Sequence, residues 1–257
     1  MAQKMESASQ LVIARGSLHP YKSIIAPHVH RRAQLLYASE GTIRVHTAAN
    51  IWLVPPQCAL WIPAGVEHSV ISLSQVRLST ALVEEKAAVS LGNQCFLVRM
   101  TNLLRELVLR LNQLAALEEQ EQSHTEDVEK ALQLLIFNEI QHALTFPIEI
   151  PWPKDKRLTS ICEALLDHPD QPKDINIWAD QINTSSRTLI RLFKKETGLS
   201  YRAWIQHMYI VLALGKLARG ESIFHIATTL GYASPSAFSA MFKRHLGHPP
   251  QRFSKVK

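Results

Sequence analysis

The sequence has few cysteines and no long apolar segment, and each absence excludes a class of protein. Its 257 residues include three cysteines, Cys58, Cys95 and Cys162. An odd number of widely separated cysteines argues against a disulfide-stapled secreted domain, so we expect reduced structural thiols, with redox sensing as the alternative. No run of 18 apolar residues is present, and the polar start MAQKMESASQ has no signal-peptide core. These features predict a cytoplasmic protein with no membrane partner.

Positive charge is scarce in the first part of the chain and abundant in the second. The formal net charge is +6. Residues 1–146 carry 12 Lys and Arg against 13 Asp and Glu, whereas residues 147–257 carry 16 against 9. Cations that neutralise phosphates drive nucleic-acid binding through counterion release. The split therefore predicts a basic DNA-binding module joined to a nearly neutral domain.

Residues 174–198, DINIWADQINTSSRTLIRLFKKETG, carry the signals of a helix-turn-helix in the right order. Asp174 is an N-cap candidate for a short helix whose apolar residues recur at intervals of three and four. Ser185 is the next N-cap candidate, and Gly198 suits the position after the second helix, where φ is commonly positive. A second helix that is apolar on one side and cationic on the other has the form that lies in a DNA major groove. For this stretch alone, a solvated basic face is the alternative.

The same pattern returns in residues 222–247, SIFHIATTLGYASPSAFSAMFKRHLG. Ser222 and Ser234 are the N-cap candidates there, and Pro235 suits the first position of the second helix. Residues 201–219 between the two units are typical of one amphipathic helix, which spans roughly 30 Å at 1.5 Å per residue. Two recognition helices at that separation would fit one face of a duplex about one turn apart.

The two recognition helices differ in the side chains that we expect to face DNA. Arg187 and Arg191 share a face and are predicted to donate to guanine, with Ile190 against a thymine methyl group. The corresponding face of the later helix has small residues, so we expect it to read DNA shape and phosphates. The complete set of predicted DNA-binding residues is Ser186, Arg187, Ile190, Arg191, Lys194, Lys195, Ser234, Ser236, Ser239, Lys243 and Arg244.

These motifs together resemble a known family. Residues 156–253 look like the DNA-binding domain of the AraC/XylS family, through SxRTLxRLFKKETG and then SIxxIAxxLGYxSxSAFxxMFKRxxGxxPxxF. The resemblance implies a sequence-specific DNA-binding transcriptional regulator with double-stranded operator DNA as its partner. It also implies a C-terminal all-α domain of seven helices that contains both helix-turn-helix motifs.

Residues 11–84 alternate short β-type runs with turn residues. Seven or so strands of this kind are typical of an all-β barrel or jelly roll. Together with the helical C-terminal part, they predict an α+β two-domain chain. Its N-terminal domain is expected to be a β-barrel of the cupin or jelly-roll type.

Two histidine motifs fall within this β region. His28 and His30 lie two residues apart, and the sequence PAGVEH ends at His68. They resemble the two motifs of cupin barrels, and the resemblance implies that the three histidines converge in the cavity, with Gln34 replacing the family's glutamate. Three neutral imidazoles suit Fe, Mn, Ni, Cu or Zn. Three alternatives stay open: a divalent transition-metal site, a small-molecule effector pocket with metal-free histidines, and a purely structural barrel.

Six apolar residues then recur at intervals of three and four, as in the a/d seam of a coiled coil. They are Leu97, Met100, Leu104, Leu107, Leu111 and Leu114. We expect this helix to mediate homodimerisation, and packing against its own barrel is the alternative. The predicted domains are a cupin-like sensing domain (1–94), a helical dimerisation segment (95–146), a Pro-rich linker (147–155) and an AraC-type DNA-binding domain (156–257).

Combined, these features resemble the branch of AraC-like regulators that contains the repressor of a nitroimidazole-efflux transporter, which implies repression. We predict a regulator controlled by a ligand or metal in the cupin domain, and not an enzyme. The rival prediction is a dioxygenase-like cupin metalloenzyme with a helical appendage. The doubled helix-turn-helix and the charge split favour the regulator, since an enzyme needs neither.

Overall fold

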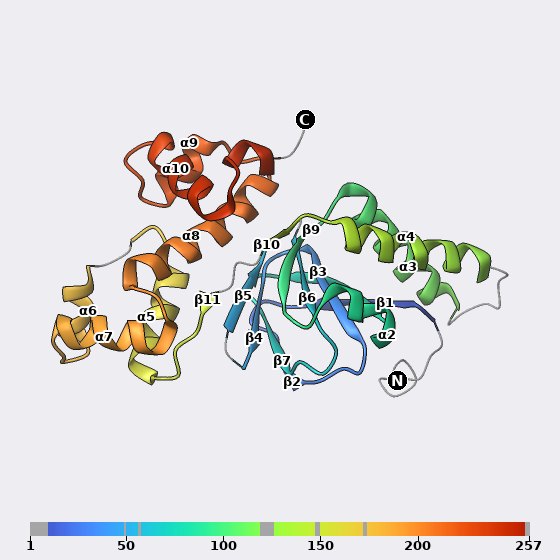
Figure 1. Cartoon of the computed structure of the whole chain (residues 1–257), viewed down its shortest axis with the longest axis horizontal. Coiled ribbons are helices and arrows are strands. Elements are labelled where there is room, and N and C mark those ends of the chain that lie inside the picture. Colours follow the sequence, from blue (N-terminus) through green and yellow to red (C-terminus); the bar gives the residue numbers. More distant parts are fainter. Residues whose placement is uncertain are drawn as a thin grey trace. The chain divides into compact units, whose positions relative to one another are not determined.

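The computed structural model describes residues 10–48, 50–55, 58–118, 126–146, 150–171 and 174–254 (Figure 1). The chain forms two compact units, residues 1–48 with 52–148 and residues 49–51 with 149–257. The first unit is built on β-sheets and the second is mostly helical. The predicted α+β two-domain class is therefore confirmed.

The strands follow the runs that the sequence predicts and add three short ones near their end. They are β1 (Val12–His19), β2 (Ile24–His28), β3 (Ala33–Glu40), β4 (Ile43–Thr47), β5 (Asn50–Val54), β6 (Cys58–Ile62), β7 (His68–Ser72), β8 (Val76–Val83), β9 (Phe96–Arg99), β10 (Thr145–Phe146) and β11 (Ile150–Pro151). One sheet has the order β1-β8-β3-β6-β9-β10, and the other has the order β11-β5-β4-β7-β2. Consecutive strands β1 and β2 form edges of different sheets. The two sheets are therefore not closed into one barrel, which corrects that part of the prediction.

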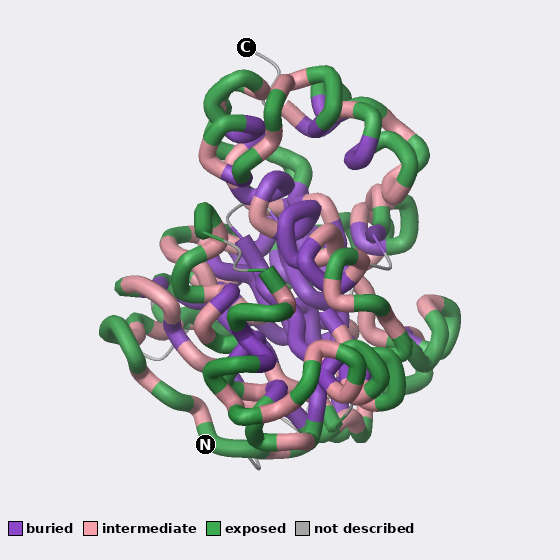
Figure 2. Tube along the Cα trace, turned by 90° about the vertical axis from the view of Figure 1, so that its left-hand side faces the viewer, coloured by how far each residue is buried: buried purple, intermediate pink, exposed green. Residues whose placement is uncertain are grey.

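Alternation along its strands gives the six-stranded sheet two different faces. One face carries Leu35, Tyr37 and Trp61, which belong to one buried core with α3 (Asn102–Glu118) and α4 (Glu126–His142). The strands of this sheet carry many of the buried residues, shown in purple in Figure 2. The other face turns toward the second sheet and lines a cavity with it. Helices thus cover one side of the sheet, and the other side faces the cavity.

The segment after β8 departs from the sequence prediction at its start. The chain first forms α2 (Glu85–Ala88) and the 3-10 helix η1 (Val89–Leu91). Leu97 then lies in a strand and Met100 precedes α3, because β9 pairs with β6 and β10. The expected helix is therefore wrong at its first two seam positions.

The predicted dimer seam is part of the chain's own core. All six of its side chains are buried within the unit that carries them, namely Leu97, Met100, Leu104, Leu107, Leu111 and Leu114. Packing against the chain's own sheet, the alternative to the dimer seam, is what the structure has. Since these side chains are already covered, they cannot supply the surface of a coiled coil with a second chain.

The described part of the second unit contains six α-helices and one 3-10 helix, so the seventh predicted helix is a 3-10 helix. They are α5 (Lys156–Asp167), α6 (Ile175–Gln181), α7 (Ser186–Thr197), α8 (Tyr201–Ala218), α9 (Ile223–Thr229), α10 (Pro235–Leu246) and η2 (Pro250–Phe253). Residues 147–149 of the predicted linker lie outside the described residues. After them, the Trp204 indole donates to the carbonyl of Pro151 at 2.8 Å, which holds the proline-rich segment against α8.

Local capping signals fix the helix ends as the sequence predicts. The predicted N-cap side chains each accept a backbone N–H of the first turn, namely Asp174, Ser185, Ser222 and Ser234, and Asp155 and Ser200 do the same for α5 and α8. Gly198 and Gly247 end α7 and α10 with φ of 70° and 73°, in the left-handed region that favours glycine. No helix among the residues described is both long and apolar enough to span a bilayer.

Candidate DNA-binding surface and effector cavity

The first helix-turn-helix, α6 and α7, is held together by a close crossing and an aromatic cluster. Ala179 on α6 is 1% exposed, and its carbonyl accepts the N–H of Thr184 at 2.9 Å. Phe193 on α7 is fully buried, with its ring centroid 5.3 Å from Tyr201 and 6.3 Å from Trp204 of α8. The inner face of α7 is therefore fixed, and its outer face is the part left for a partner.

The outer face of α7 is cationic and open to solvent. Arg187, Ile190 and Arg191 are exposed, and half of the Ile190 surface is accessible. Lys194 and Lys195 are exposed in the last turn. Arg187 and Arg191 form no ion pair with any residue that the structure describes. Two guanidinium groups four residues apart are thus free to donate to base edges.

Two predicted DNA-binding serines are engaged inside the protein. The Ser186 hydroxyl donates to the side-chain oxygen of Asn176, which ties α7 to α6. The Ser234 hydroxyl accepts the N–H of Ala237 at 3.1 Å as the N-cap of α10. Both hydroxyls therefore stabilise the helix-turn-helix frames, whatever they contact on DNA.

The outer face of α10 is built from small side chains. Ser236 and Ala240 are exposed and Ser239 is half-buried. Cations appear only near its end, where Lys243 and Arg244 are exposed in the last turn. This face has little capacity for bidentate donation to bases, and its two positive charges lie in the last turn of the helix.

Helix α8 joins the two helix-turn-helix units into one framework. Its 18 residues span roughly 27 Å at 1.5 Å per residue. Phe193 packs against its N-terminal half, and Tyr209 contacts the ring of Tyr232 at 5.9 Å between centroids. Tyr232 in turn contacts Phe238 of α10 at 5.6 Å. Both recognition helices are therefore anchored on the same helix.

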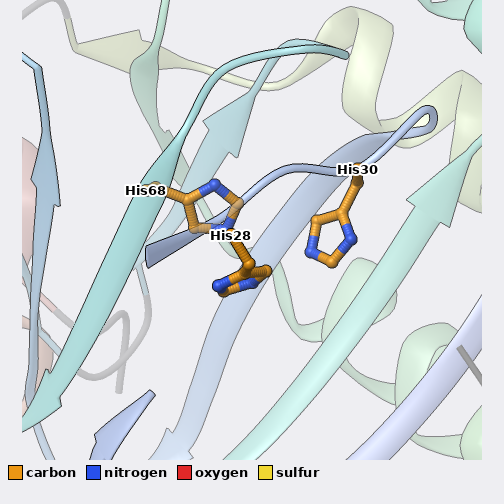
Figure 3. A group of neighbouring side chains, drawn as sticks. All are labelled: His28, His30 and His68. Atoms are coloured by element: carbon orange, nitrogen blue, oxygen red, sulfur yellow. The ribbon is translucent and has the colours of Figure 1, made fainter. Parts of the chain in front are cut away.

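In the first unit, the structure brings the three motif histidines together (Figure 3). His28 pairs directly opposite His68 in the β2–β7 ladder, and His30 follows β2. Ring centroids lie 4.4 Å apart for His28 and His68, 4.7 Å for His28 and His30, and 5.4 Å for His30 and His68. One ring nitrogen from each lies within 4.8 Å of the others, which is close enough to share one ion.

Backbone contacts set the tautomers of two of these imidazoles. The Nδ1 atoms of His28 and His68 lie 2.8 and 3.0 Å from the carbonyl oxygens of Ala26 and Val66. A carbonyl only accepts, so Nδ1 is the donor in each contact, and in the neutral imidazole Nε2 then has the lone pair, which is the usual arrangement in metal-binding histidines.

His68 is buried, and its imidazole is neutral near pH 7. It is 2% exposed, and burial lowers its pKa to about 4, with smaller contributions from His28 and His30. Its Nε2 has no hydrogen-bond partner among the described residues. A lone pair without a proton or partner, aimed at two other imidazoles, fits a divalent transition metal.

A cavity of about 390 Å³ lies between the two sheets beside the histidines. Gln34 reaches it from β3, is 6% exposed, and its side-chain oxygen has no partner in the described structure. The cavity is lined by Arg15, Ser17, His19, Ile25, His28, His30, Arg32, Gln34, Leu36, Val70, Leu78, Thr80 and Leu82. All four predicted effector residues are therefore at or beside one cavity.

Two arginines of this cavity, Arg15 and Arg32, were not predicted from the sequence. Arg15, Ser17 and His19 alternate with apolar residues and glycine along β1 and share one face of the strand. This period of two is the sequence signal from which the position of Arg15 could have been predicted. Arg32 has no such signal. An arginine in a sequence is normally expected to be exposed, and nothing near Arg32 in the sequence indicates that it is buried. It donates to the carbonyls of Gln10 at 2.9 Å and Leu82 at 3.4 Å. Burial lowers the pKa of Arg32, and the charge of Glu84 opposes that shift.

Comparison with known proteins places these two units in one family. Residues 10–136 match the model of an AraC-like ligand-binding domain, and residues 178–255 match a helix-turn-helix domain. The chain is 33% identical to the HTH-type transcriptional regulator NimR of Escherichia coli over 88% of this chain and 81% of that protein. The chain belongs to the AraC family of transcriptional regulators. It is accordingly a DNA-binding regulator with an N-terminal ligand-binding domain.

Other AraC-type proteins match in part or at low identity. Regulator RipA of Corynebacterium glutamicum is 30% identical over 40% of this chain and 31% of its own length. ToxT from Vibrio cholerae is 13% identical over 95% of this chain and 98% of its own, with a TM-score of 0.37. The DNA-binding domain of AdpA, solved with a target DNA, is 26% identical over 38% of this chain and 88% of its own, with a TM-score of 0.36.

Proposed function

We propose that this AraC-family protein represses transcription, with α7 reading bases, α10 holding the DNA backbone, and a ligand in the N-terminal cavity altering the binding. The observation that carries the proposal is the contrast between two exposed helix faces on one framework. Arg187 and Arg191 are exposed on α7, and bidentate donation by an arginine to guanine contributes roughly 1–3 kcal/mol of base discrimination. The face of α10 supports positioning instead.

The test is selection of bound sites from a randomised duplex library with the full chain. We expect an enriched motif whose strongest positions lose their preference in Arg187→Ala and Arg191→Ala. Equal enrichment by these variants and the unmodified protein would contradict the role of α7. Transcription from a promoter that overlaps the selected site then decides the sign, since a repressor lowers the transcript yield and an activator raises it.

We propose a homodimer whose contact uses α4 and not the buried seam. Val128, Leu134 and Leu135 are 50%, 63% and 49% exposed on this helix. Exposed apolar side chains clustered on one element are typical of an association surface. Sedimentation should show that Leu134→Lys shifts the protein toward monomer, whereas Val89→Lys, which places the same charge on an exposed apolar residue outside α4, leaves the dimer intact. A monomeric unmodified protein would refute this part.

We also propose that His28, His30 and His68 hold a divalent transition metal. Bound there, the ion would supply a Lewis-acidic positive charge at the cavity wall. Mass spectrometry of untagged protein should find near-stoichiometric metal that is lost in His28→Ala and in His68→Ala. His142→Ala is the matched control, because His142 is an exposed histidine on α4. Metal that persists in both site variants would refute the assignment.

A second candidate function rests on the same three histidines, because three imidazoles on one ion are also a catalytic arrangement. The relatives that match this chain are transcriptional regulators, which favours a sensing role. Oxygen consumption by iron-loaded protein with small aromatic substrates measures the catalytic alternative. Turnover that is lost in His68→Ala would establish it.

A further inference from the structure

The cavity beside the histidines has an unusual charge inventory. Its ionisable lining residues are Arg15, Arg32, His19, His28 and His30, with His68 beside them, and no aspartate or glutamate of the described chain lines it. Gln34 occupies the position where the cupin resemblance expects a carboxylate. Glu84 lies close enough to influence Arg32, but its carboxylate accepts the N–H of Ala87 at 2.9 Å and is not part of the lining.

This inventory has a consequence for any divalent ion held by the three imidazoles. Neutral ligands leave the ion's two positive charges uncompensated, and the exposed Arg15 and the buried Arg32 add two more at the cavity wall. Uncompensated charge in a partly buried site is unfavourable unless an opposite charge enters it. Three nitrogen ligands also leave coordination positions open toward whatever fills the cavity.

Apart from the hydroxyl side chains Ser17 and Thr80, the remaining lining is apolar. Ile25 and Val70 face the cavity from the five-stranded sheet, and Leu36, Leu78 and Leu82 face it from the six-stranded sheet. A ligand that fits must therefore combine an anionic end with an apolar body. The 390 Å³ volume lies within the range of small-molecule sites.

We infer that the effector is a small organic anion whose oxygen atoms complete the coordination of the metal held by His28, His30 and His68, with its apolar body between the two sheets. The inference rests on the metal assignment of the proposed function. Arg15 acts as a positioning residue that pairs with the anionic end. Because the Gln34 side chain is uncharged, the cavity lining supplies no negative charge to balance the metal ion. The ligand must therefore supply that negative charge.

The test uses the full chain loaded with Co²⁺, whose visible spectrum reports its coordination. The probes are benzoate and octanoate, each compared with the neutral amide of the same shape. We expect saturable spectral shifts with the two carboxylates and none with the amides. Arg15→Gln should weaken carboxylate binding roughly tenfold, while Arg31→Gln, which removes an exposed arginine outside the cavity lining, should leave it unchanged.

A second variant changes the charge of the cavity lining while nearly preserving the shape of the side chain. Gln34→Glu supplies an internal carboxylate, so we expect it to retain Co²⁺ more tightly and to respond less to the two carboxylates. A Co²⁺ spectrum that ignores all four probes would overturn this inference and leave the metal site standing. Absence of Co²⁺ binding would overturn both the inference and the metal assignment. Carboxylate binding of equal affinity by calorimetry with and without Co²⁺ would overturn the role of the metal in recognition.

Discussion

The two helix-turn-helix units share a framework of equivalent buried residues and turn hydrogen bonds, which we call the frame. They differ in the side chains on the exposed face of the second helix. Counted from their N-caps, Phe193 and Phe242 are equivalent, and both are fully buried. On the exposed face, Arg187 corresponds to Ser236 and Arg191 corresponds to Ala240. The positions that hold helices together are thus kept alike, while the positions that can touch bases differ in charge and length. Packing and surface charge are therefore set by different residues of the same helix.

The turn within each unit shows how one geometry accepts different residues. Asn183 has φ of 52° in the first unit, and Gly231 has φ of 72° at the equivalent place. Both are residue types that tolerate the left-handed region. The next N–H, of Thr184 or of Tyr232, donates to the carbonyl of the crossing alanine at 2.9 Å in both units. The turn of the second unit has one more residue before its N-cap than the turn of the first unit. The hydrogen bond to the alanine carbonyl forms in both units despite this difference.

The largest expected effect tests the shared frame. Phe193→Ala and Phe242→Ala should each lower the free energy of unfolding by about 3–5 kcal/mol, because each removes a fully buried ring. Urea titration followed by far-UV circular dichroism measures both. Phe224→Ala is the matched control, since Phe224 is 69% exposed. A loss in only one of the two buried variants would show that the frames are not equivalent.

The next effect sharpens the difference between the outer faces. Arg191→Ala should remove about 1–3 kcal/mol of discrimination at particular base pairs, because it deletes a bidentate donor. Ser239→Ala on α10 should leave discrimination within about 0.5 kcal/mol, as is usual for a small polar side chain with no special contact. Binding to a panel of single-base operator variants measures both. Uniform weakening across the panel by Arg191→Ala would mean that Arg191 contacts phosphate instead.

A smaller effect concerns the N-caps. Ser185 and Ser234 each accept a backbone N–H at 3.1 Å, from Thr188 and Ala237. Replacing either serine by alanine should lower the free energy of unfolding by about 1 kcal/mol, because one helical donor loses its partner. Thermal unfolding provides the measurement, with Ser236→Ala as the control. Unequal costs at the two caps would limit the equivalence of the units to their cores.

The smallest expected effect is electrostatic. Lys243→Ala should weaken binding to every DNA sequence by a few-fold and reduce the salt slope by about one, because one phosphate contact is lost. Fluorescence anisotropy at several salt concentrations gives the slope. Lys130→Ala, in the N-terminal unit, is the control and should change nothing. Sequence-dependent weakening by Lys243→Ala would give α10 a share of base reading.

The sequence predicted what is local. Each described α-helix of the DNA-binding unit begins at a side chain that can cap it, such as Asp155 and Ser222, and such signals act within a single turn. The strands from β1 to β8 were likewise predictable from short runs and turns. The approach of His28 to His68 was predictable only through the cupin resemblance, because the ladder that joins them is non-local.

The sequence could not predict what depends on distant pairing. Leu97 continues the helical spacing of the leucines after it, yet it lies in β9 because its backbone pairs with Leu60 of β6. The burial of the seam depends on the sheet that covers it, which no spacing reveals. Arg32 escaped detection for the same reason, since its partners are backbone carbonyls from Gln10 and Leu82.

The central claim is that α7 supplies the base-specific contacts on a frame that both units share. Its most direct test gives α7 the outer face of α10, through the triple variant Arg187→Ser, Ile190→Ser and Arg191→Ala. We predict a folded protein with unchanged unfolding midpoint that still binds duplex DNA in low salt but no longer enriches a motif from a randomised library. Enrichment of the same motif by the triple variant would contradict the claim and move base reading to another surface.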